Sequence, residues 1–368
     1  MQVRYSYLQQ QFADCEDLWA ALKRFVPTGD FTLGKPLQEF ESRFAKLIGT
    51  QHAIGVNSGT DAIKLSLKAL GVGFGDEVIT AANTFVATVG AIAEIGAKPV
   101  FVDCDDTFCM DVSQVESVIT ERTKAIVPVH FTGYMTDMRQ LLPLAQKYNL
   151  PIVEDACQSI LGAIEGKNAG TWGNTGTFSL HPLKNLNVWS DGGIIVTDDD
   201  AIADKLRLLR NHGLLDRDTV QILGYNSRLD TIQAVVGNWL IPQTEDIAQR
   251  RIENAKYYDE GLGVIPGIKI PPRPTDFRVV YHLYIVFAED RDALLQYCLD
   301  NGIEAKIHYP IPIYRQSALD HLNHQEGDFP VSDRHAKTII SFPCDQHLSQ
   351  AEMDYVIDTV SSFYNSQT

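Results

Sequence analysis

The sequence predicts an α/β fold in which a mostly parallel sheet is flanked by helices and followed by a small α+β domain. Short apolar runs alternate with segments of helical spacing through the first two thirds of the chain, a pattern typical of a parallel sheet covered on both faces. A long helical stretch, about residues 229–262, then leads to a proline-rich segment at 266–274. With 368 residues and 45% hydrophobic content, the chain is long enough for a large core and two domains.

Each predicted element follows from its own pattern of residues. A leading helix over 15–25 stops at Pro27, because proline lacks the N–H that a continuing helix needs. β-Branched and apolar runs predict strands at 52–56, 77–80, 99–103, 125–130, 152–154, 177–180, 194–197, 281–287 and 303–307. Apolar residues at helical spacing predict helices at 35–48, 58–70, 85–95, 112–119, 137–148, 201–211, 290–301 and 350–364.

We expect three parts in the chain. Residues 1–30 form an N-terminal arm with one helix, residues 31–240 form a large domain, and residues 241–368 form a small domain that begins within the long helical stretch. The glycine-rich run Gly71-Val-Gly-Phe-Gly75 follows a helix and precedes a strand. This order is the reverse of a dinucleotide-binding fingerprint, so we interpret the run as a helix C-cap and turn.

Composition excludes several classes of function. A net charge of −16 argues against non-specific nucleic-acid binding. The first residues show no basic segment followed by an apolar one, and no apolar run is long enough to span a bilayer, so we expect no signal peptide and no membrane partner. The six cysteines are scattered without a Cys-x-x-Cys pair, which favours reduced thiols and a cytoplasmic location. The histidines and cysteines form no metal-binding pattern, so we expect no metal.

Lys184 lies between the predicted strands 177–180 and 194–197, which we expect to be joined by a tight turn. Leu183 and Leu186 flank it. A lysine on a turn is usually a solvated surface charge. A partly dry pocket would instead lower the pKa of the amine and free its lone pair for attack on a carbonyl. Both interpretations are open on this stretch alone.

Asp155 directly follows the predicted strand 152–154, and Gln158 comes shortly after it. Ligands of open α/β sheets lie at the carboxyl ends of strands, which is where this carboxylate is expected. A strand-end aspartate followed by a lysine on a later turn is the pair that a pyridoxal phosphate site requires. The lysine holds the cofactor, and the aspartate keeps the pyridine nitrogen protonated so that the ring can act as an electron sink.

Two further stretches are compatible with this cofactor. Ser58-Gly59-Thr60 opens a helix, and free N–H groups at a helix start form a phosphate site as readily as an ordinary N-cap. Phe85 lies at a strand-to-helix junction on the ligand side of the sheet. Its ring can pack in the core or stack on a flat cofactor.

Five stretches taken together carry a specific resemblance. They are Asn57-Ser-Gly-Thr-Asp61, Asn83-Thr-Phe85, Val153-Glu-Asp-Ala-Cys-Gln158, Ser179-Leu-His-Pro-Leu-Lys184 with Asp191-Gly-Gly193, and Gly224-Tyr-Asn-Ser-Arg228. In this order and over most of the chain, they resemble the DegT/DnrJ/StrS-type nucleotide-sugar aminotransferases, within fold type I of the pyridoxal phosphate enzymes. The resemblance implies a mostly parallel, seven-stranded sheet in the large domain and pyridoxal 5'-phosphate as cofactor.

The resemblance also implies roles for individual residues. Lys184 and Asp155 are the catalytic residues: Lys184 carries the cofactor and moves a proton, and Asp155 pairs with the pyridinium. The other implied cofactor contacts are Gly59, Thr60 and Ser179 at the phosphate, Phe85 on the ring face, Gln158 at the ring hydroxyl, and Asn226 at the phosphate of the neighbouring subunit. A shared site of this kind implies a homodimer. In the family His308 and Tyr309 look into the substrate cleft, although such a pair is more often structural.

The implied reaction transfers an amino group from L-glutamate to a keto group of a dTDP- or UDP-linked deoxyhexulose. Relatives that dehydrate sugars carry histidine at the position of Lys184, and His181 does not align with it. Asp191-Gly-Gly193 resembles relatives that aminate C3, whereas Ser179-Leu-His-Pro182 resembles those that aminate C4. We favour C3.

Three alternatives stay open. The acceptor can be a nucleotide-free keto-sugar, such as an inosose or an oxidised sugar acid. The chain can be a dehydratase or lyase on the same scaffold. It can also be a sensor domain that binds the cofactor without turnover, although the sequence offers no attached DNA-binding module or basic helix.

Overall fold

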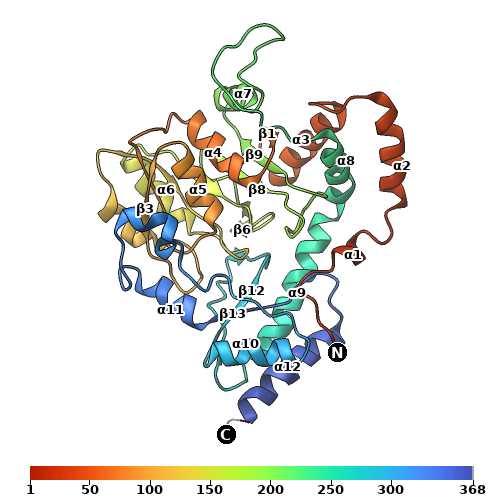
Figure 1. The fold of residues 1–368 in the computed structure, drawn as a ribbon, viewed down its shortest axis with the longest axis vertical. Helices are drawn as coiled ribbons and strands as arrows, with labels where there is room; N and C mark the ends of the chain where they lie inside the picture. Colours follow the sequence, from red (N-terminus) through yellow and green to blue (C-terminus); the bar gives the residue numbers. More distant parts are fainter. Residues whose placement is uncertain (367–368) are drawn as a thin grey trace.

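The computed structural model describes residues 1–366 and has one large sheet at its centre (Figure 1). The strands of this sheet are β1 (His52–Val56), β2 (Glu77–Ala81), β3 (Lys98–Val102), β4 (Thr123–Val127), β5 (Val153–Asp155), β8 (Thr175–Ser179) and β9 (Gly193–Thr197). A four-stranded part, β1-β9-β8-β5, meets a three-stranded part, β4-β2-β3. Parallel bridges from Ile126 to Ile152 and from Val129 to Asp155 join the two parts.

Only β9 runs antiparallel to its neighbours in this sheet; the other adjacent pairs are parallel. The predicted mostly parallel, seven-stranded sheet is therefore confirmed. Strands β8 and β9 are joined by residues 180–192, which is a longer connection than the tight turn we expected. This longer connection places Lys184 beyond the carboxyl end of β8.

Helices cover both faces of the large sheet. One face is packed by α3 (Lys35–Ile48), α6 (Met138–Lys147) and α8 (Thr231–Leu240), and the other by α4 (Gly59–Ala69), α5 (Val86–Glu94) and α7 (Asp200–Leu209). On the first face, Phe44 of α3 meets Phe178 of β8 with ring centroids 5.2 Å apart. On the second face, Leu67 of α4 shares a core with Val127 and Val153. The alternation of side chains along each strand supplies both cores.

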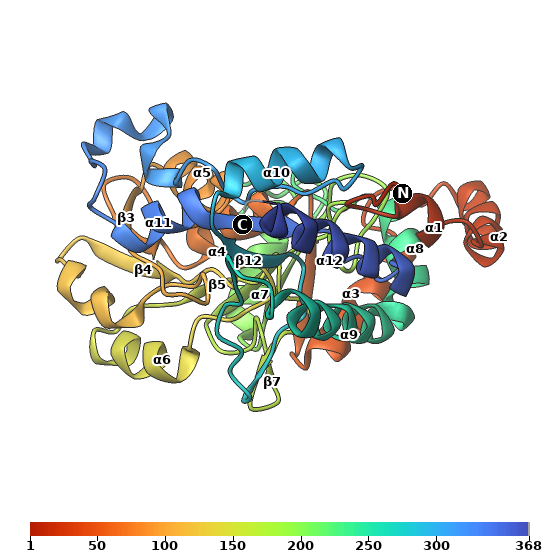
Figure 2. The same ribbon diagram turned by 90° about the horizontal axis from the view of Figure 1, so that it is seen from below.

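A second, smaller sheet follows the long helical stretch. It consists of β10 (Ile268–Lys269), β12 (Tyr284–Ala288) and β13 (Ile339–Phe342). Packed against it are α9 (Thr244–Leu262), α10 (Arg291–Asp300) and α12 (Gln350–Asn365), which lie together at one end of the molecule (Figures 1 and 2). Tyr258, Leu294 and Val360 are buried in the core that these elements share.

The N-terminal segment begins near the second sheet and then packs against α8, a helix of the large sheet. Its helices are α1 (Leu8–Gln11), α2 (Glu16–Phe25) and the 3₁₀ turn η1 (Val26–Thr28). Val3 pairs with Ile303 near the second sheet, whereas Leu18 and Leu22 of α2 pack on Val236 of α8. The segment between them therefore passes over the region where the two sheets meet.

Several expected elements are corrected by the structure. The stretch 229–262 is not continuous, because α8 ends in the 3₁₀ turn η3 (Ile241–Gln243) before α9 begins, and Pro242 has no N–H to donate. The segment 112–119 contains a 3₁₀ helix, η2 (Val112–Val118). The predicted strand 303–307 is wrong, since only Ile303 and Lys306 make bridges there, to Val3 and Ser341.

The sequence prediction missed α11 (Pro330–Thr338) and β13. The remaining short elements are β6 (Ala163–Ile164), β7 (Lys167–Asn168), β11 (Phe277–Arg278), η4 (Ile313–Arg315) and η5 (Ser317–Leu322). The boundaries of the arm and of the two domains stay predictions. Within residues 1–366, none of the helices combines the length and the apolar character that crossing a bilayer requires.

Candidate active site

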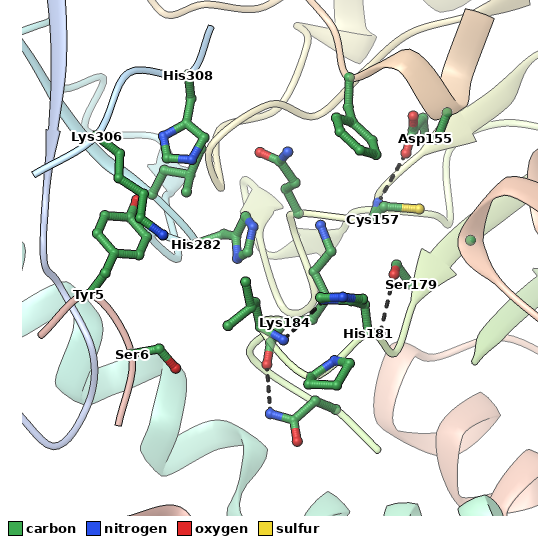
Figure 3. Close-up of a pocket in the computed structure, with 18 of the residues that line it drawn as sticks. Tyr5, Ser6, Asp155, Cys157, Ser179, His181, Lys184, His282, Lys306 and His308 are labelled. Carbon is green, nitrogen blue, oxygen red and sulfur yellow. Dashed lines mark hydrogen bonds between the residues drawn. The ribbon is translucent and has the colours of Figure 1, made fainter. Parts of the chain in front are cut away.

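A cavity of about 300 Å³ lies where the large sheet, the second sheet and the N-terminal segment meet (Figure 3). Its wall includes the carboxyl end of β5, the starts of α4 and α5, and the 180–192 connection. Nine predicted site residues line it: Gly59, Thr60, Phe85, Asp155, Gln158, Ser179, Lys184, His308 and Tyr309. Asn226 lies elsewhere. Stretches that are far apart in the sequence thus converge on one place.

Lys184 projects into the middle of this cavity (Figure 3). Its backbone N–H donates to the carbonyl of His181, and its own carbonyl accepts from the Asn187 side chain at 2.9 Å. Burial lowers the pKa of the Lys184 amine, although Cys157 and Asp155 oppose that shift. The amine therefore has the partly desolvated surroundings that favour its neutral, nucleophilic form.

Asp155 is buried at the end of β5, and both of its carboxylate oxygens have partners. One accepts a hydrogen bond from the hydroxyl of Thr88 at 2.7 Å, and the other accepts from the N–H of Cys157 at 3.2 Å. Thr84 lies 2.7 Å from the Thr88 hydroxyl and completes a short chain. These contacts fix the orientation of the carboxylate in the cavity wall.

The start of α4 offers two unused backbone donors. Ser58 accepts from the N–H of Asp61 through its side chain and from Ala62 through its carbonyl. The first N–H groups of a helix have no partner within it, which leaves those of Gly59 and Thr60 for an anion. A Cβ on Gly59 would lie 2.8 Å from the Cβ of Ser179. Only glycine allows the helix start to approach β8 so closely.

Phe85 and Gln158 present their side chains to the same cavity. Phe85 is the N-cap residue of α5 and is 50% exposed. Part of its aromatic ring is therefore accessible in the cavity. Its centroid lies 5.8 Å from that of Tyr309. The Gln158 oxygen accepts from the backbone N–H of Thr132 at 2.7 Å, so the amide NH₂ group of Gln158 points away from Thr132.

His308 and Tyr309 enter the cavity from the segment after Ile303. His308 Nδ1 lies 2.8 Å from the hydroxyl of Ser341. Burial, reinforced by Lys306 and Lys184, lowers the pKa of His308 to about 4, so the ring is neutral at physiological pH. Burial likewise raises the pKa of Tyr309, which keeps its phenol protonated. Both groups are thus available as uncharged hydrogen-bond donors or acceptors.

Asn226 is the one predicted site residue outside this cavity. It lies in a separate depression with Phe31, Asn57, Arg228 and Asp230. Its backbone pairs with Asn211 in an isolated bridge. The side chain therefore cannot serve the cavity of its own chain.

Several lining residues were not anticipated from the sequence. Thr88, which holds Asp155, lies three residues after Phe85 and so on the same side of α5, a spacing that could have revealed it. Tyr5, His282 and Lys306 come from distant segments and carry no local motif. The described part of the chain, residues 1–366, contains no group of three or more His, Cys, Asp or Glu side chains arranged to hold a metal ion.

Comparison with known proteins identifies the family. Residues 13–361 match the DegT/DnrJ/EryC1/StrS aminotransferase family. The chain belongs to this family. It is 38% identical to a pleiotropic regulatory protein of Geobacillus stearothermophilus, over 97% of each chain. It is 39% identical to the dTDP-3-amino-3,4,6-trideoxy-α-D-glucose transaminase of Streptomyces venezuelae, over 93% of this chain and 90% of that one.

Solved structures agree with this family membership. S. venezuelae DesV, determined in complex with a ketimine intermediate, shares 37% identity and superposes with a TM-score of 0.96 over 99% of this chain and 98% of that one. The PLP form of a putative sugar aminotransferase, Spr1654 of Streptococcus pneumoniae, shares 26% identity with a TM-score of 0.89, over 96% and 97% of the two chains. The chain is an aminotransferase of the pyridoxal phosphate type.

The groups that line the cavity are those that pyridoxal phosphate requires. It combines two free helix amides for a phosphate, an oriented buried carboxylate for a ring nitrogen, an exposed aromatic face, and an amine whose pKa is lowered. Each of these groups matches one chemical part of the cofactor. No single group would be decisive, but all of them line one cavity.

Proposed function

We propose that this aminotransferase moves an amino group from L-glutamate to C3 of a keto-sugar linked to dTDP or UDP. The observation that carries the proposal is the placement of Lys184 and Asp155 in one cavity together with His308 and Tyr309. Two similar proteins, the S. venezuelae dTDP-sugar transaminase and a UDP-N-acetyl-3-dehydro-α-D-glucosamine 3-aminotransferase of Acidithiobacillus ferrooxidans, 38% identical over 94% of each chain, are named for amination at C3.

In this proposal different residues would contact different parts of the cofactor. The N–H groups of Gly59 and Thr60, with the hydroxyl of Ser179, would hold the phosphate. Phe85 would pack on the ring face, and the Gln158 NH₂ group would donate to the ring hydroxyl oxygen. When bound, pyridoxal phosphate supplies an electrophilic carbon for amine attachment and a ring that withdraws electrons from the substrate.

Lys184 and Asp155 would then be the residues of this chain that take part in the reaction. Because burial lowers its pKa, the Lys184 amine can both attach the cofactor and later take and return a proton at the substrate carbon. Asp155, held by Thr88 and Cys157, would pair with a protonated ring nitrogen. His308 and Tyr309 would hydrogen-bond the sugar.

The acceptor is tested by supplying candidate keto-sugars with L-glutamate and measuring 2-oxoglutarate release. We expect turnover with a nucleotide-linked 3-keto-sugar and little with its 4-keto isomer. Preference for the 4-keto isomer would refute C3 amination. Preference for an inosose or another nucleotide-free keto-sugar would refute the nucleotide-linked substrate class.

We also propose a homodimer with shared active sites and a cytoplasmic location. The exposed depression around Asn226 supports the first, because that side chain has no access to its own cavity. Six free cysteines support the second, since reduced thiols are typical of the cytosol.

A mixing experiment tests the shared site. Lys184→Ala and Asn226→Ala homodimers are each expected to be impaired, whereas exchanged subunits should regain activity because one of the two sites in each mixed dimer is intact. If the mixture stays as inactive as its parents although subunit exchange is demonstrated, Asn226 does not serve the partner.

A further inference from the structure

One lysine in the cavity wall has no role in the proposed cofactor chemistry. Three lysine or arginine side chains line the cavity: Lys184, Arg251 and Lys306. Arg251 is engaged with Asp345 at 3.4 Å and with Gln346 at 3.0 Å. Within residues 1–366, the Lys306 side chain makes no hydrogen bond or ion pair, and its Nζ lies 4.4 Å from the ring centroid of Tyr5. Lys306 is therefore a cation without a carboxylate partner.

Lys306 is an exposed side chain, and about half of the lysines and arginines within residues 1–366 likewise make no ion pair, so its position in the cavity wall is what distinguishes it. Aspartate and glutamate outnumber lysine and arginine by 47 to 31, and the well-buried Lys64 is paired with both Asp61 and Glu94. Lys306 is instead fixed at a wall of the cavity, because its backbone pairs with Ser341 in both directions and its side chain lies on Tyr5. A cation held in place without a counter-charge is suited to bind an anion that arrives with a ligand.

Two imidazoles extend this part of the wall. His308 lies beside Tyr5, with ring centroids 5.8 Å apart, and its contact with Ser341 uses only one ring nitrogen. His282 also lines the cavity, and its Nδ1 is buried without a hydrogen-bond partner. A buried ring nitrogen of this kind normally finds a partner, which points to a polar group supplied by a ligand.

The position of this cluster assigns the anion to a substrate. In Figure 3, Tyr5, Lys306 and His308 lie together on one side of the cavity, Asp155 and Ser179 lie on the other, and Lys184 and His282 lie between them. The cofactor phosphate is proposed for the side with Ser179. An anion beside Lys306 would consequently lie beyond Lys184, where the amino donor and the keto-sugar must enter.

We infer that Lys306, with His282 and His308, forms an oxyanion subsite that binds a carboxylate or phosphate group of a substrate. The inference rests on the proposed aminotransferase function and deepens it. Two sources share this chemistry: the side-chain carboxylate of an L-glutamate donor and the diphosphate of a nucleotide-linked sugar. Tyr5 contributes by supporting the Lys306 side chain from the N-terminal segment.

Two probes of the cofactor-loaded protein distinguish these sources. The first compares the concentrations of L-glutamate and L-alanine that half-bleach the visible cofactor band, because alanine lacks the second carboxylate. The second measures the dissociation constant of dTDP by calorimetry. The variants are Lys306→Met, which removes the charge, and Lys306→Arg, which keeps it. Lys124→Met, an exposed lysine on β4 outside the cavity, controls for the loss of one positive charge.

We expect Lys306→Met to weaken one probe by about tenfold or more, the size of a lost charge-assisted hydrogen bond. Loss of dTDP affinity assigns the diphosphate, and loss of the preference for glutamate over alanine assigns the carboxylate. Lys306→Arg and Lys124→Met should stay within about threefold of the parent. The inference is overturned if neither probe changes by more than twofold in Lys306→Met, or if the parent protein neither binds dTDP nor prefers glutamate.

The same experiment keeps this inference separate from the proposed function. If no amino acid bleaches the band of the parent protein, the transamination proposal fails, and the dTDP measurement still tests Lys306. If both amino acids bleach the band equally in the parent and in Lys306→Met, and dTDP affinity is unchanged, the subsite fails while transamination stands. Thermal melting of each variant verifies that the fold is intact.

Discussion

Glu154 and Asp155 are adjacent carboxylates that the structure places in opposite surroundings. Both are buried, and because side chains alternate along β5 they point to opposite faces of the sheet. Glu154 accepts hydrogen bonds from the N–H groups of Gly170, Trp172 and Gly173 at 2.9, 2.7 and 2.7 Å, and lies 2.8 Å from His130 Nε2. Its carboxylate is thus saturated by protein donors.

We predict that Glu154→Gln destabilises the fold and that Asp155→Asn does not. In the glutamine variant one carboxylate oxygen becomes an NH₂ group, so two of the four donors lose their acceptor. Hydrogen bonds to a charged group contribute about 1.5–3 kcal/mol each, which gives a loss of about 3–6 kcal/mol. That is a large part of the roughly 5–15 kcal/mol by which folded proteins are stable.

Asparagine at 155 can keep both contacts. Its oxygen can still accept from the Cys157 N–H, and its NH₂ group can donate to the Thr88 hydroxyl, which also accepts. We therefore expect a stability change of about 1 kcal/mol or less. Activity should instead fall by about a hundredfold or more, because an uncharged side chain no longer stabilises a protonated ring nitrogen.

Urea unfolding of the cofactor-free proteins, followed by far-UV circular dichroism, measures the first effect, and turnover of the loaded proteins measures the second. Glu154→Gln should lower the urea midpoint strongly while any folded fraction keeps its cofactor band. Equal midpoints for the two variants, or near-normal turnover by Asp155→Asn, would show that the roles of these neighbours have been wrongly assigned.

Three further predictions concern the cavity and two buried histidines. Lys184→Ala should still bind pyridoxal phosphate, as measured by equilibrium dialysis, but should lack turnover; full turnover would remove Lys184 from the chemistry. Gly59→Ala should destabilise the fold by about 1–3 kcal/mol through overpacking and weaken cofactor binding, because the added Cβ would meet Ser179 at 2.8 Å; an unchanged cofactor dissociation constant would exclude the helix start as the phosphate site. Burial lowers the pKa values of His308 and His335 to about 4, so the unfolded chain binds more protons between about pH 6.5 and 4. The stabilisation from the neutral rings is therefore complete above about pH 6.5 and is lost as the pH falls toward 4, by up to about 1.4 kcal/mol per pH unit for each ring. Urea midpoints measured from pH 7.5 down to pH 4.5 check this, and a His335→Gln variant should show a shallower decline.

The centre of the site could be predicted from the sequence because its chemistry is local. Asp155 ends an apolar strand, and Lys184 lies on the connection between two further strands. Strand ends of a parallel sheet converge, so sequence order and hydrophobic pattern were enough to bring these two residues together. The start of α4 at Gly59 was predictable for a similar reason, since a helix N-terminus is set by its own few residues.

The opposite side of the cavity could not be predicted in this way. Tyr5 lies near the N-terminus and Lys306 in the last quarter of the chain, and they meet where Val3 pairs with Ile303 and the Tyr5 N–H donates to Glu304. The segment 303–307 has the β-branched pattern of a strand, yet its contacts are divided between the N-terminal segment and β13. Tertiary pairing of that kind leaves no periodic signal in the sequence. β13 is a different case: it is a run of four residues, two of them β-branched, that directly follows α11, and its short length gave too few positions for a pattern.

The visible absorption spectrum of the purified, pyridoxal phosphate-loaded protein, recorded before and after addition of L-glutamate, tests the central claim most directly. We predict a yellow band that bleaches with glutamate and returns when 2-oxoglutarate is added in excess. A band that glutamate does not change would contradict this donor or transamination itself. If no band forms with pyridoxal phosphate, the assignment of Lys184 and of the cavity around it is wrong.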